Sequence, residues 1–168
     1  MTYKIKPIRE DFLQKVRVSG IDDLNQKVTY LTARGGEPCR DVLRRARVGE
    51  ELILASYCPF KQNGPYKEYG PIFVLANEST ENVNYFQLPI STHLHTNEKH
   101  DYLQKSFVLR AYNQKEEIID AKVVSEDESQ DILLQFLKNE ETDFVIARFT
   151  AYGCYGLRVE RHNSGENL

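Results

Sequence analysis

The central part of the chain alternates short apolar runs with turn-rich polar segments. Residues 52–57 (Leu-Ile-Leu-Ala-Ser-Tyr) and 72–76 (Ile-Phe-Val-Leu-Ala) are almost continuously apolar. Side chains of a strand point alternately to the two faces of a sheet, so such a run indicates a strand that is buried on both faces. These two segments are therefore expected at the centre of a sheet.

Further segments rich in β-branched and aromatic residues also predict strands. They lie at residues 12–18, 28–33, 107–112, 117–124, 144–152 and 155–161. A short edge strand is expected at 84–89, because Pro89 cannot donate to a β-ladder. Residues 113–115 suit a hairpin turn between two of the strands.

Two segments have the periodicity of amphipathic helices. The first lies between Pro38, which favours the first turn of a helix, and Gly49, which favours the position beyond its end. Its apolar stripe consists of Cys39, Val42, Leu43 and Ala46. The second is expected at 129–139, where Ser125 and Glu128 ahead of it are spaced as a capping box.

This order of elements predicts an α+β fold with a mainly antiparallel sheet of about seven strands and two short helices. A single domain is expected at 1–161, followed by a flexible C-terminal tail at 162–168. Residues 91–105 have weak periodicity and predict an irregular segment that could act as a lid.

Composition narrows the class of protein. The 168 residues are 40% hydrophobic and 28% charged, with a net charge of −3, which gives no reason to expect binding to nucleic acid or to a membrane surface. No apolar run approaches a membrane span, and the first residues lack the core of a secretory signal. We expect a cytoplasmic protein with three free thiols and no structural zinc site.

Two cysteines are candidates for chemistry. Cys39, with Arg40 beside it, would lie at the start of the first helix, where backbone N–H groups lower a thiol pKa or bind an anion. The alternative, which buried cysteines favour, is a small hydrophobic side chain in the apolar stripe. Cys154 lies between Gly153 and Tyr155, in a sequence that permits a tight turn and an approach to Cys39, although a packed hairpin is the simpler interpretation.

The loop between the two central runs has unusual turn chemistry. Two Gly-Pro pairs, at 64–65 and 70–71, bracket Tyr66, Glu68 and Tyr69. Glu68 could serve as a general base or bind a cation, and the phenols could line a pocket. Equally, the glycines and prolines could shape a turn in which Glu68 is solvated.

Arg110 and Arg148 lie within strand-like segments that are otherwise apolar. An arginine on a core-facing side must be paired or must face a cavity. The candidate partners are Glu37, Asp41, Glu68 or a bound anion, and the alternative is that one or both arginines project to solvent or form a structural ion pair.

Metal and cofactor motifs are weak. His93 and His95 would share one face of a strand, but this spacing is common by chance and no metal site is expected. The chain contains no Walker loop, GxSxG elbow, HExxH helix or GxGxxG motif, so no cofactor is expected.

Taken together, segments 36–43, 50–60 and 64–74, with Leu109-Arg110-Ala111-Tyr112 and Gly153-Cys154-Tyr155, resemble the DUF1203 family. The resemblance covers about residues 33–161 and implies a small bacterial protein without an established activity. Leu75 stands where relatives tend to carry a histidine, so chemistry that needs that imidazole is not implied here.

Three functional hypotheses follow. The first is a pocket for a small anionic molecule, lined by the Cys39 helix start, Arg40, Tyr66, Glu68, Tyr69, Arg110, Arg148, Cys154 and Tyr155. The second is an enzyme with Cys39 or Cys154 as nucleophile and Glu68 as general base. The third is a structural or interaction protein in which these residues maintain the fold.

Overall fold

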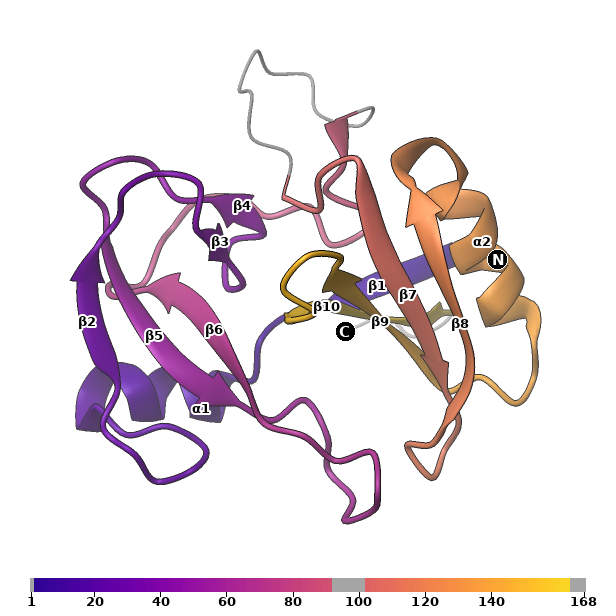
Figure 1. Ribbon diagram of the computed structural model, residues 1–168, viewed down its shortest axis with the longest axis horizontal. Helices are drawn as coiled ribbons and strands as arrows, with labels where there is room; N and C mark the ends of the chain where they lie inside the picture. The colour runs from indigo at the N-terminus through magenta and orange to yellow at the C-terminus, as the bar shows by residue number, and fades with distance from the viewer. Residues whose placement is uncertain (1, 92–101, 164–168) are drawn as a thin grey trace.

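The strands of this chain are divided between two five-stranded sheets that lie side by side (Figure 1). The computed structural model describes residues 2–91 and 102–163. Sheet I has the order β2-β5-β6-β3-β4, and sheet II has the order β1-β10-β9-β7-β8.

Sheet I is built around the two apolar runs. Its strands are β2 (Thr29–Thr32), β5 (Glu51–Tyr57), β6 (Gly70–Leu75), β3 (Pro38–Cys39) and β4 (Arg44–Arg45). β5 and β6 pair antiparallel in the middle of the sheet, with Leu54 opposite Phe73. β3 joins β6 in parallel, with Cys39 opposite Phe73. The expectation that the two runs form the sheet centre is confirmed.

Sheet II is antiparallel throughout. Its strands are β1 (Thr2–Lys6), β10 (Tyr155–His162), β9 (Phe144–Phe149), β7 (Ser106–Tyr112) and β8 (Ile118–Ser125). Every residue of β9 is buried, because this strand is central and both faces of the sheet are covered.

Each sheet carries helical structure on one face (Figure 1). α1 (Glu10–Gln14) continues into the π-helical turn η1 (Lys15–Ser19), which packs Phe12 and Val16 onto sheet I. α2 (Glu126–Lys138) packs Leu133 and Leu137 onto sheet II. The predicted capping box of Ser125 and Glu128 is present at its start. Within the described residues no helix is long and apolar enough to span a membrane.

A shared hydrophobic core joins the two sheets. Ile53 and Tyr57 of β5 belong to the same cluster as Phe144 and Ile146 of β9 and Tyr112 of β7. These side chains alternate along their strands, so the opposite face of each strand is left for other contacts. The prediction of one domain at 1–161 stays a prediction. His162 belongs to β10, and residues 164–168 lie outside the described part of the chain.

The predicted α+β class, with antiparallel strands and two helices, is confirmed, but three of the predicted elements are wrong. No helix starts at Pro38. β3 is followed by a turn at 40–43, in which Leu43 has a φ of 51°, and then by β4. The amide of Arg40 donates to the Phe73 carbonyl at 3.0 Å, so pairing with β6 overrides the helical stripe. Residues 12–18, predicted as a strand, are α1 and η1.

Two further segments, β1 and residues 84–89, also differ from the sequence prediction. β1 was not expected, although Tyr3 and Ile5 alternate toward the core. Residues 84–89 form a turn rather than an edge strand, with the amide of Ile5 donating to the Tyr85 carbonyl.

Arg44 holds the β4 end of sheet I to two neighbouring loops. Its guanidinium donates to both carboxylate oxygens of Glu50 at 2.7 and 2.9 Å, and its Nε donates to Glu81 at 2.7 Å. These hydrogen bonds from Arg44 lower the pKa of Glu50 to about 2.

We expect acid to weaken this part of the fold in a specific range of pH. A carboxyl whose pKa is lower in the folded state stabilises it above the unfolded pKa, and that contribution is lost as pH falls from about 4.5 to about 2. The partly exposed pair should contribute on the order of 1–2 kcal/mol. Urea unfolding of the wild type and Arg44→Gln over this range should show the loss in the wild type alone. Lys122→Gln, which removes an exposed pair with Glu128, is the control and should leave the wild-type pH dependence intact.

Candidate functional site

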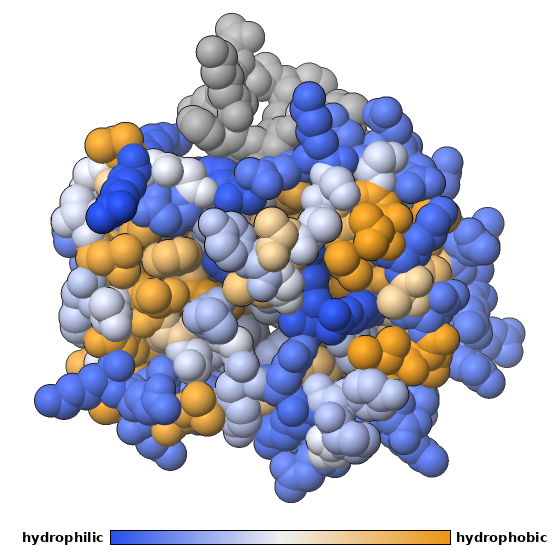
Figure 2. Space-filling model, in the orientation of Figure 1, coloured by the Kyte–Doolittle hydropathy of each residue, from blue (hydrophilic) through white to orange (hydrophobic). Residues whose placement is uncertain are grey.

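A groove of about 1460 Å³ opens between sheet I and the hairpin that joins β9 to β10. Its floor is the face of sheet I that does not contact sheet II. Leu31 of β2, Leu54 of β5 and Phe73 of β6 line this floor and remain partly exposed. Figure 2 shows hydrophobic side chains gathered over these three strands. The groove therefore has an apolar base.

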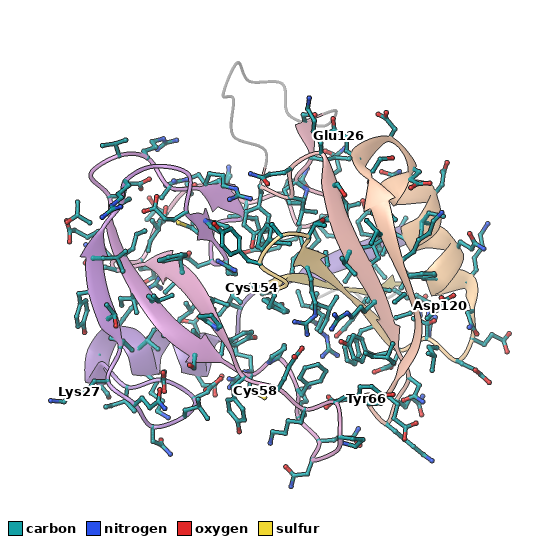
Figure 3. All side chains as sticks on the ribbon, in the orientation of Figure 1. Lys27, Cys58, Tyr66, Asp120, Glu126 and Cys154 are labelled. Atoms are coloured by element: carbon teal, nitrogen blue, oxygen red, sulfur yellow. The ribbon has the colours of Figure 1, made fainter. Side chains whose placement is uncertain are left out.

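The opposite wall is the β9–β10 hairpin, residues 149–154. The amide of Gly153, at a φ of 70°, donates to the Phe149 carbonyl at 2.8 Å. The amide of Phe149 in turn donates to the Cys154 carbonyl at 3.1 Å. This turn directs Tyr152 outward, where 88% of it is exposed. Cys154 lies between the two sheets (Figure 3).

Positive charge is concentrated around the groove. Among the described residues, the charged side chains that line it are Arg34, Glu37, Arg40, Arg45 and Lys105. The carboxylate of Glu37 accepts the amides of Arg34 and Gly35, both at 2.8 Å, so it is held within its own loop. Because the whole chain has a net charge of −3, this excess of cations is a local feature rather than a consequence of composition.

Arg40 is the most deeply buried of these cations, with 3% of the residue exposed. Its Nε donates to the Tyr155 carbonyl at 2.9 Å and its Nη1 to the Pro38 carbonyl at 2.7 Å. Its Cζ lies 5.1 Å from the centre of the Phe149 ring. Across residues 2–91 and 102–163, no carboxylate forms an ion pair with it. Burial lowers the pKa of Arg40.

Arg45 approaches the same aromatic ring. Its Cζ also lies 5.1 Å from the centre of Phe149. Its guanidinium donates to the carbonyls of Gly36 at 2.9 Å and Tyr102 at 2.8 Å. Phe149 is therefore flanked by two cations, and the cation–π contacts offset part of the cost of bringing these charges together.

Cys39 does not have the environment that a helix start would have provided. It is fully buried in β3 among Ala33, Leu52 and Leu75, and it does not line the groove. Burial raises the pKa of its thiol to about 12, which is opposite to the lowering that the sequence suggested. The hydrophobic interpretation of Cys39 describes this site, and the reactive-thiolate hypothesis for Cys39 is wrong.

Cys154, by contrast, lines the groove and is half-buried. Its thiol donates to the Tyr152 carbonyl at 3.6 Å. Tyr155, the next residue, points into the core, where burial raises the pKa of its phenol well above the ordinary value. The backbone carbonyl of Tyr155, rather than its phenol, is the group that contacts Arg40.

Glu68 and Arg148 form an ion pair between the Arg148 Nη2 and a Glu68 carboxylate oxygen. The Arg148 side chain is 6% exposed and that of Glu68 is 45% exposed. Arg148 also donates to the Gly153 carbonyl at 3.3 Å. The pair thus ties the loop between β5 and β6 to the β9–β10 hairpin, and it is one of the alternatives that the sequence left open for both residues.

The other predicted pocket residues lie away from the groove. Tyr66 lines a separate cavity of about 240 Å³, together with Lys115 and Glu117. Tyr69 is exposed at 42% and lines neither cavity. Arg110 is half-buried on sheet II and lines neither cavity. The single cleft predicted from all these residues is therefore not present; of that set, Arg40 and Cys154 line the groove.

The loop between β5 and β6 is held by a residue that the sequence did not single out. The buried carboxylate of Glu116 accepts the amide of Lys61 at 3.0 Å and that of Gln62 at 2.9 Å. This contact explains why the turn-rich segment has a defined position, and it supports the structural interpretation of its special residues.

No group of three His, Cys, Asp or Glu side chains arranged for a metal ion occurs in the described residues. His93, His95 and most of the suggested lid at 91–105 lie outside them. Lys105, the last residue of that segment, lines the groove.

Comparison with protein families gives one match, which covers residues 36–161 and is described as a protein of unknown function, DUF1203. The match spans most of the chain, including β9, the hairpin and the segment that carries Arg40. The chain belongs to the DUF1203 family. No curated protein and no solved structure matches it. Membership confirms the resemblance seen in the sequence, and the DUF1203 region contains all the charged groove residues except Arg34.

Sequence reasoning missed most of the groove. Leu31, Leu54 and Phe73 were assigned to strands, but their exposure on one face depends on which strands become neighbours. Lys105 ends the segment 91–105, whose weak periodicity gave no sign of where its side chains would lie. Arg45 carried a signal, since Arg44-Arg45 follows an apolar pair, but the expected helix placed it on a solvated face.

Of the three thiols in this DUF1203 protein, we expect only Cys154 to react with iodoacetamide in the folded state. Cys39 is fully buried with a raised pKa, and Cys58 is buried with its thiol donating to the Phe60 carbonyl. Peptide mapping after alkylation should find the label on Cys154, and Cys154→Ser should abolish labelling. The protein unfolded in urea should label at all three positions. Fast labelling of Cys39 in the folded protein would contradict the described burial.

The Glu68–Arg148 pair should contribute to stability. Glu68→Gln should lower the free energy of unfolding by about 1–2 kcal/mol, because Arg148 stays buried without its partner. In the Arg148→Met background the same change should cost less, so a double-mutant cycle should give a coupling of about 1 kcal/mol. Lys67→Gln, at the neighbouring half-buried position, removes a surface hydrogen bond to Asn63; it is the control and should change stability by less than about 0.5 kcal/mol. Additive effects of the two substitutions would argue against the pair.

Proposed function

We propose that this protein binds a small anionic molecule in the groove and that Arg40 is its main charged contact. The observation that carries the proposal is a guanidinium that is almost fully buried, lines the groove and has no carboxylate partner in the described parts of the chain. Proteins pair buried charges or use them to bind ligands, because an isolated buried charge is costly.

The contacts within the protein offset the buried positive charge of Arg40 only in part. Two backbone carbonyls accept two of the five N–H groups of the guanidinium, and the Phe149 ring stacks against it. These are dipole and quadrupole interactions and leave the net charge uncancelled. A bound carboxylate or phosphate would supply the opposite charge and accept the remaining donors.

The set of ligand-binding residues in this proposal differs from the one that the sequence suggested. Arg40 is retained, Arg45 and Lys105 add positive charge at the rim, and Cys154 contributes to the wall. Arg148 is paired with Glu68 and Arg110 lies elsewhere, so neither is proposed as an anion clamp. The groove, at about 1460 Å³, is large enough to hold a small molecule, whose sites commonly have about 300–1,000 Å³.

A cysteine-dependent enzyme receives less support. Cys154 is the one thiol among the described residues that faces the groove, but the proposed base, Glu68, is engaged by Arg148. A structural role for Arg40, as a tie between β3 and β10, explains its two carbonyl contacts but not its position on an open groove. The three free thiols support the expectation of a reducing, cytoplasmic compartment.

Small anions should raise the melting temperature of the wild type in an Arg40-dependent manner. A ligand present at 100 times its Kd adds about 2.7 kcal/mol, which corresponds to a rise of roughly 5–10 °C for a domain of this size. Thermal-shift measurements with acetate, citrate and phosphate should show this rise. Arg40→Gln should abolish it, and Arg40→Lys should retain part of it because the charge is kept.

Arg158→Gln is the matched control for that experiment. Arg158 also stacks on a phenylalanine, with its Cζ 3.6 Å from the Phe144 ring centre, and donates to the carbonyl of Pro59, but it is paired with Glu160 outside the groove. This variant should keep the response to anions. If no anion stabilises the wild type, or if Arg40→Gln responds as the wild type does, the proposed function is rejected in favour of a structural role.

A further inference from the structure

We infer that the anion is amphipathic: a carboxylate head on Arg40 with an apolar body that lies across β6, β5 and β2 on Phe73, Leu54 and Leu31. This inference rests on the proposed function and names the class of ligand for the same groove. It is drawn from the floor of the groove, whereas the proposed function is drawn from its charge.

The apolar floor begins directly beside Arg40. The Arg40 amide donates to the carbonyl of Phe73 at 3.0 Å, and Phe73 is the cross-strand partner of Leu54. Leu31 lies on β2, the next strand, which pairs with β5. Neighbouring strands are about 4.8 Å apart, so the floor extends roughly 10 Å from β6 to the edge of the sheet. Because Arg40 lines the same groove as these three residues, the apolar track begins on the strand next to the residue that carries the charge.

The three floor residues share a face that the described part of the chain leaves partly exposed. Their neighbours Ile53, Ile72 and Val74 point into the core between the sheets. On the same face as the floor, Leu52 and Leu75 are covered by the β3–β4 segment, where they form a cluster with Cys39, Val42 and Ala46. The floor is thus the uncovered continuation of a packed hydrophobic layer, and a ligand with an apolar body would complete it.

The dimensions of the groove also favour a ligand larger than a simple ion. A volume of about 1460 Å³ exceeds what acetate or phosphate would fill, and small-molecule sites commonly have about 300–1,000 Å³. Tyr152 lines the groove from the hairpin and is 88% exposed. Its ring is available to contact the apolar body from the side opposite the floor.

A chain-length series tests this inference. Calorimetric titrations would compare acetate, butyrate, hexanoate, octanoate and decanoate, with octanol as the neutral control for the head group. We expect the affinity to rise about fourfold for each added methylene until the chain spans the floor, because each methylene leaves water. Octanol should bind at least tenfold more weakly than octanoate, and Arg40→Gln should reduce octanoate binding to the level of octanol.

Two variants on the same strand provide a matched test of the floor. Leu31→Glu places a carboxylate beside the apolar body and should weaken octanoate binding by tenfold or more. Tyr30→Glu changes the adjacent residue, which is 62% exposed and does not line the groove, and should leave binding unchanged. Tyr152→Ser, at an exposed position that holds no core contact, should weaken octanoate but not acetate.

The outcomes separate this inference from the proposed function. If acetate and decanoate bind equally well, with both depending on Arg40, the amphipathic ligand is ruled out and the anion site stands. If affinity rises with chain length but octanol binds as well as octanoate and Arg40→Gln has no effect, the groove is only apolar and both conclusions fail. If neither this series nor the small anions bind, the proposed function fails and the inference fails with it.

Discussion

The packing of the two sheets against each other is the contact on which the rest of this structure depends. Ile53 and Tyr57 of β5 share a buried cluster with Phe144 and Ile146 of β9, the rings of Tyr57 and Tyr155 meet edge to face at 5.4 Å, and this core holds together two sheets that share no strand. Because side chains alternate along a strand, using this face of β5 for the shared core turns Leu54 to the opposite side. The open floor of the groove is therefore a direct consequence of how the two sheets join.

Arg40 reinforces that junction with polar contacts. It bonds to the carbonyl of Pro38 in sheet I and to that of Tyr155 in sheet II, and it stacks on Phe149, where β9 ends. A residue that hydrogen-bonds to both sheets must lie where they meet, and Arg40 also lines the groove there. The same position that makes Arg40 a tie between sheets leaves its charge beside the groove without a carboxylate from the described residues.

The fold was predictable where periodicity and burial agree. The runs at 52–57 and 72–76 form the central strands β5 and β6, which have one face in the shared core and the other covered only at Leu52 and Leu75. The helix α2 was found by its capping box and stripe. The prediction of a helix from Pro38 was wrong because backbone pairing to β6 overrides its helical stripe. This pairing joins Cys39 to Phe73, 34 residues away in sequence, so local patterns do not contain it. The strand predicted at 12–18 was wrong for a related reason. Phe12 and Val16 would share one face of a strand, but Phe12, Leu13 and Val16 also share one face of a helix, and the helix is what forms.

The site was less predictable than the fold because an arginine in an apolar segment can either form a structural ion pair or face a cavity. The sequence suggested Arg40 as a neighbour of Cys39 at a helix start and Arg110 and Arg148 as arginines within apolar strands. In the structure Arg148 is paired with Glu68, Arg110 lies away from the groove, and Arg40 contacts two carbonyls and an aromatic ring. Separating these cases requires the partner of each guanidinium, which depends on tertiary contacts. Of the three, Arg40 is the one that lines the groove, and it forms no ion pair with a carboxylate of the described residues. That coincidence of unmatched charge and open apolar surface is what a purely structural role for Arg40 leaves unexplained.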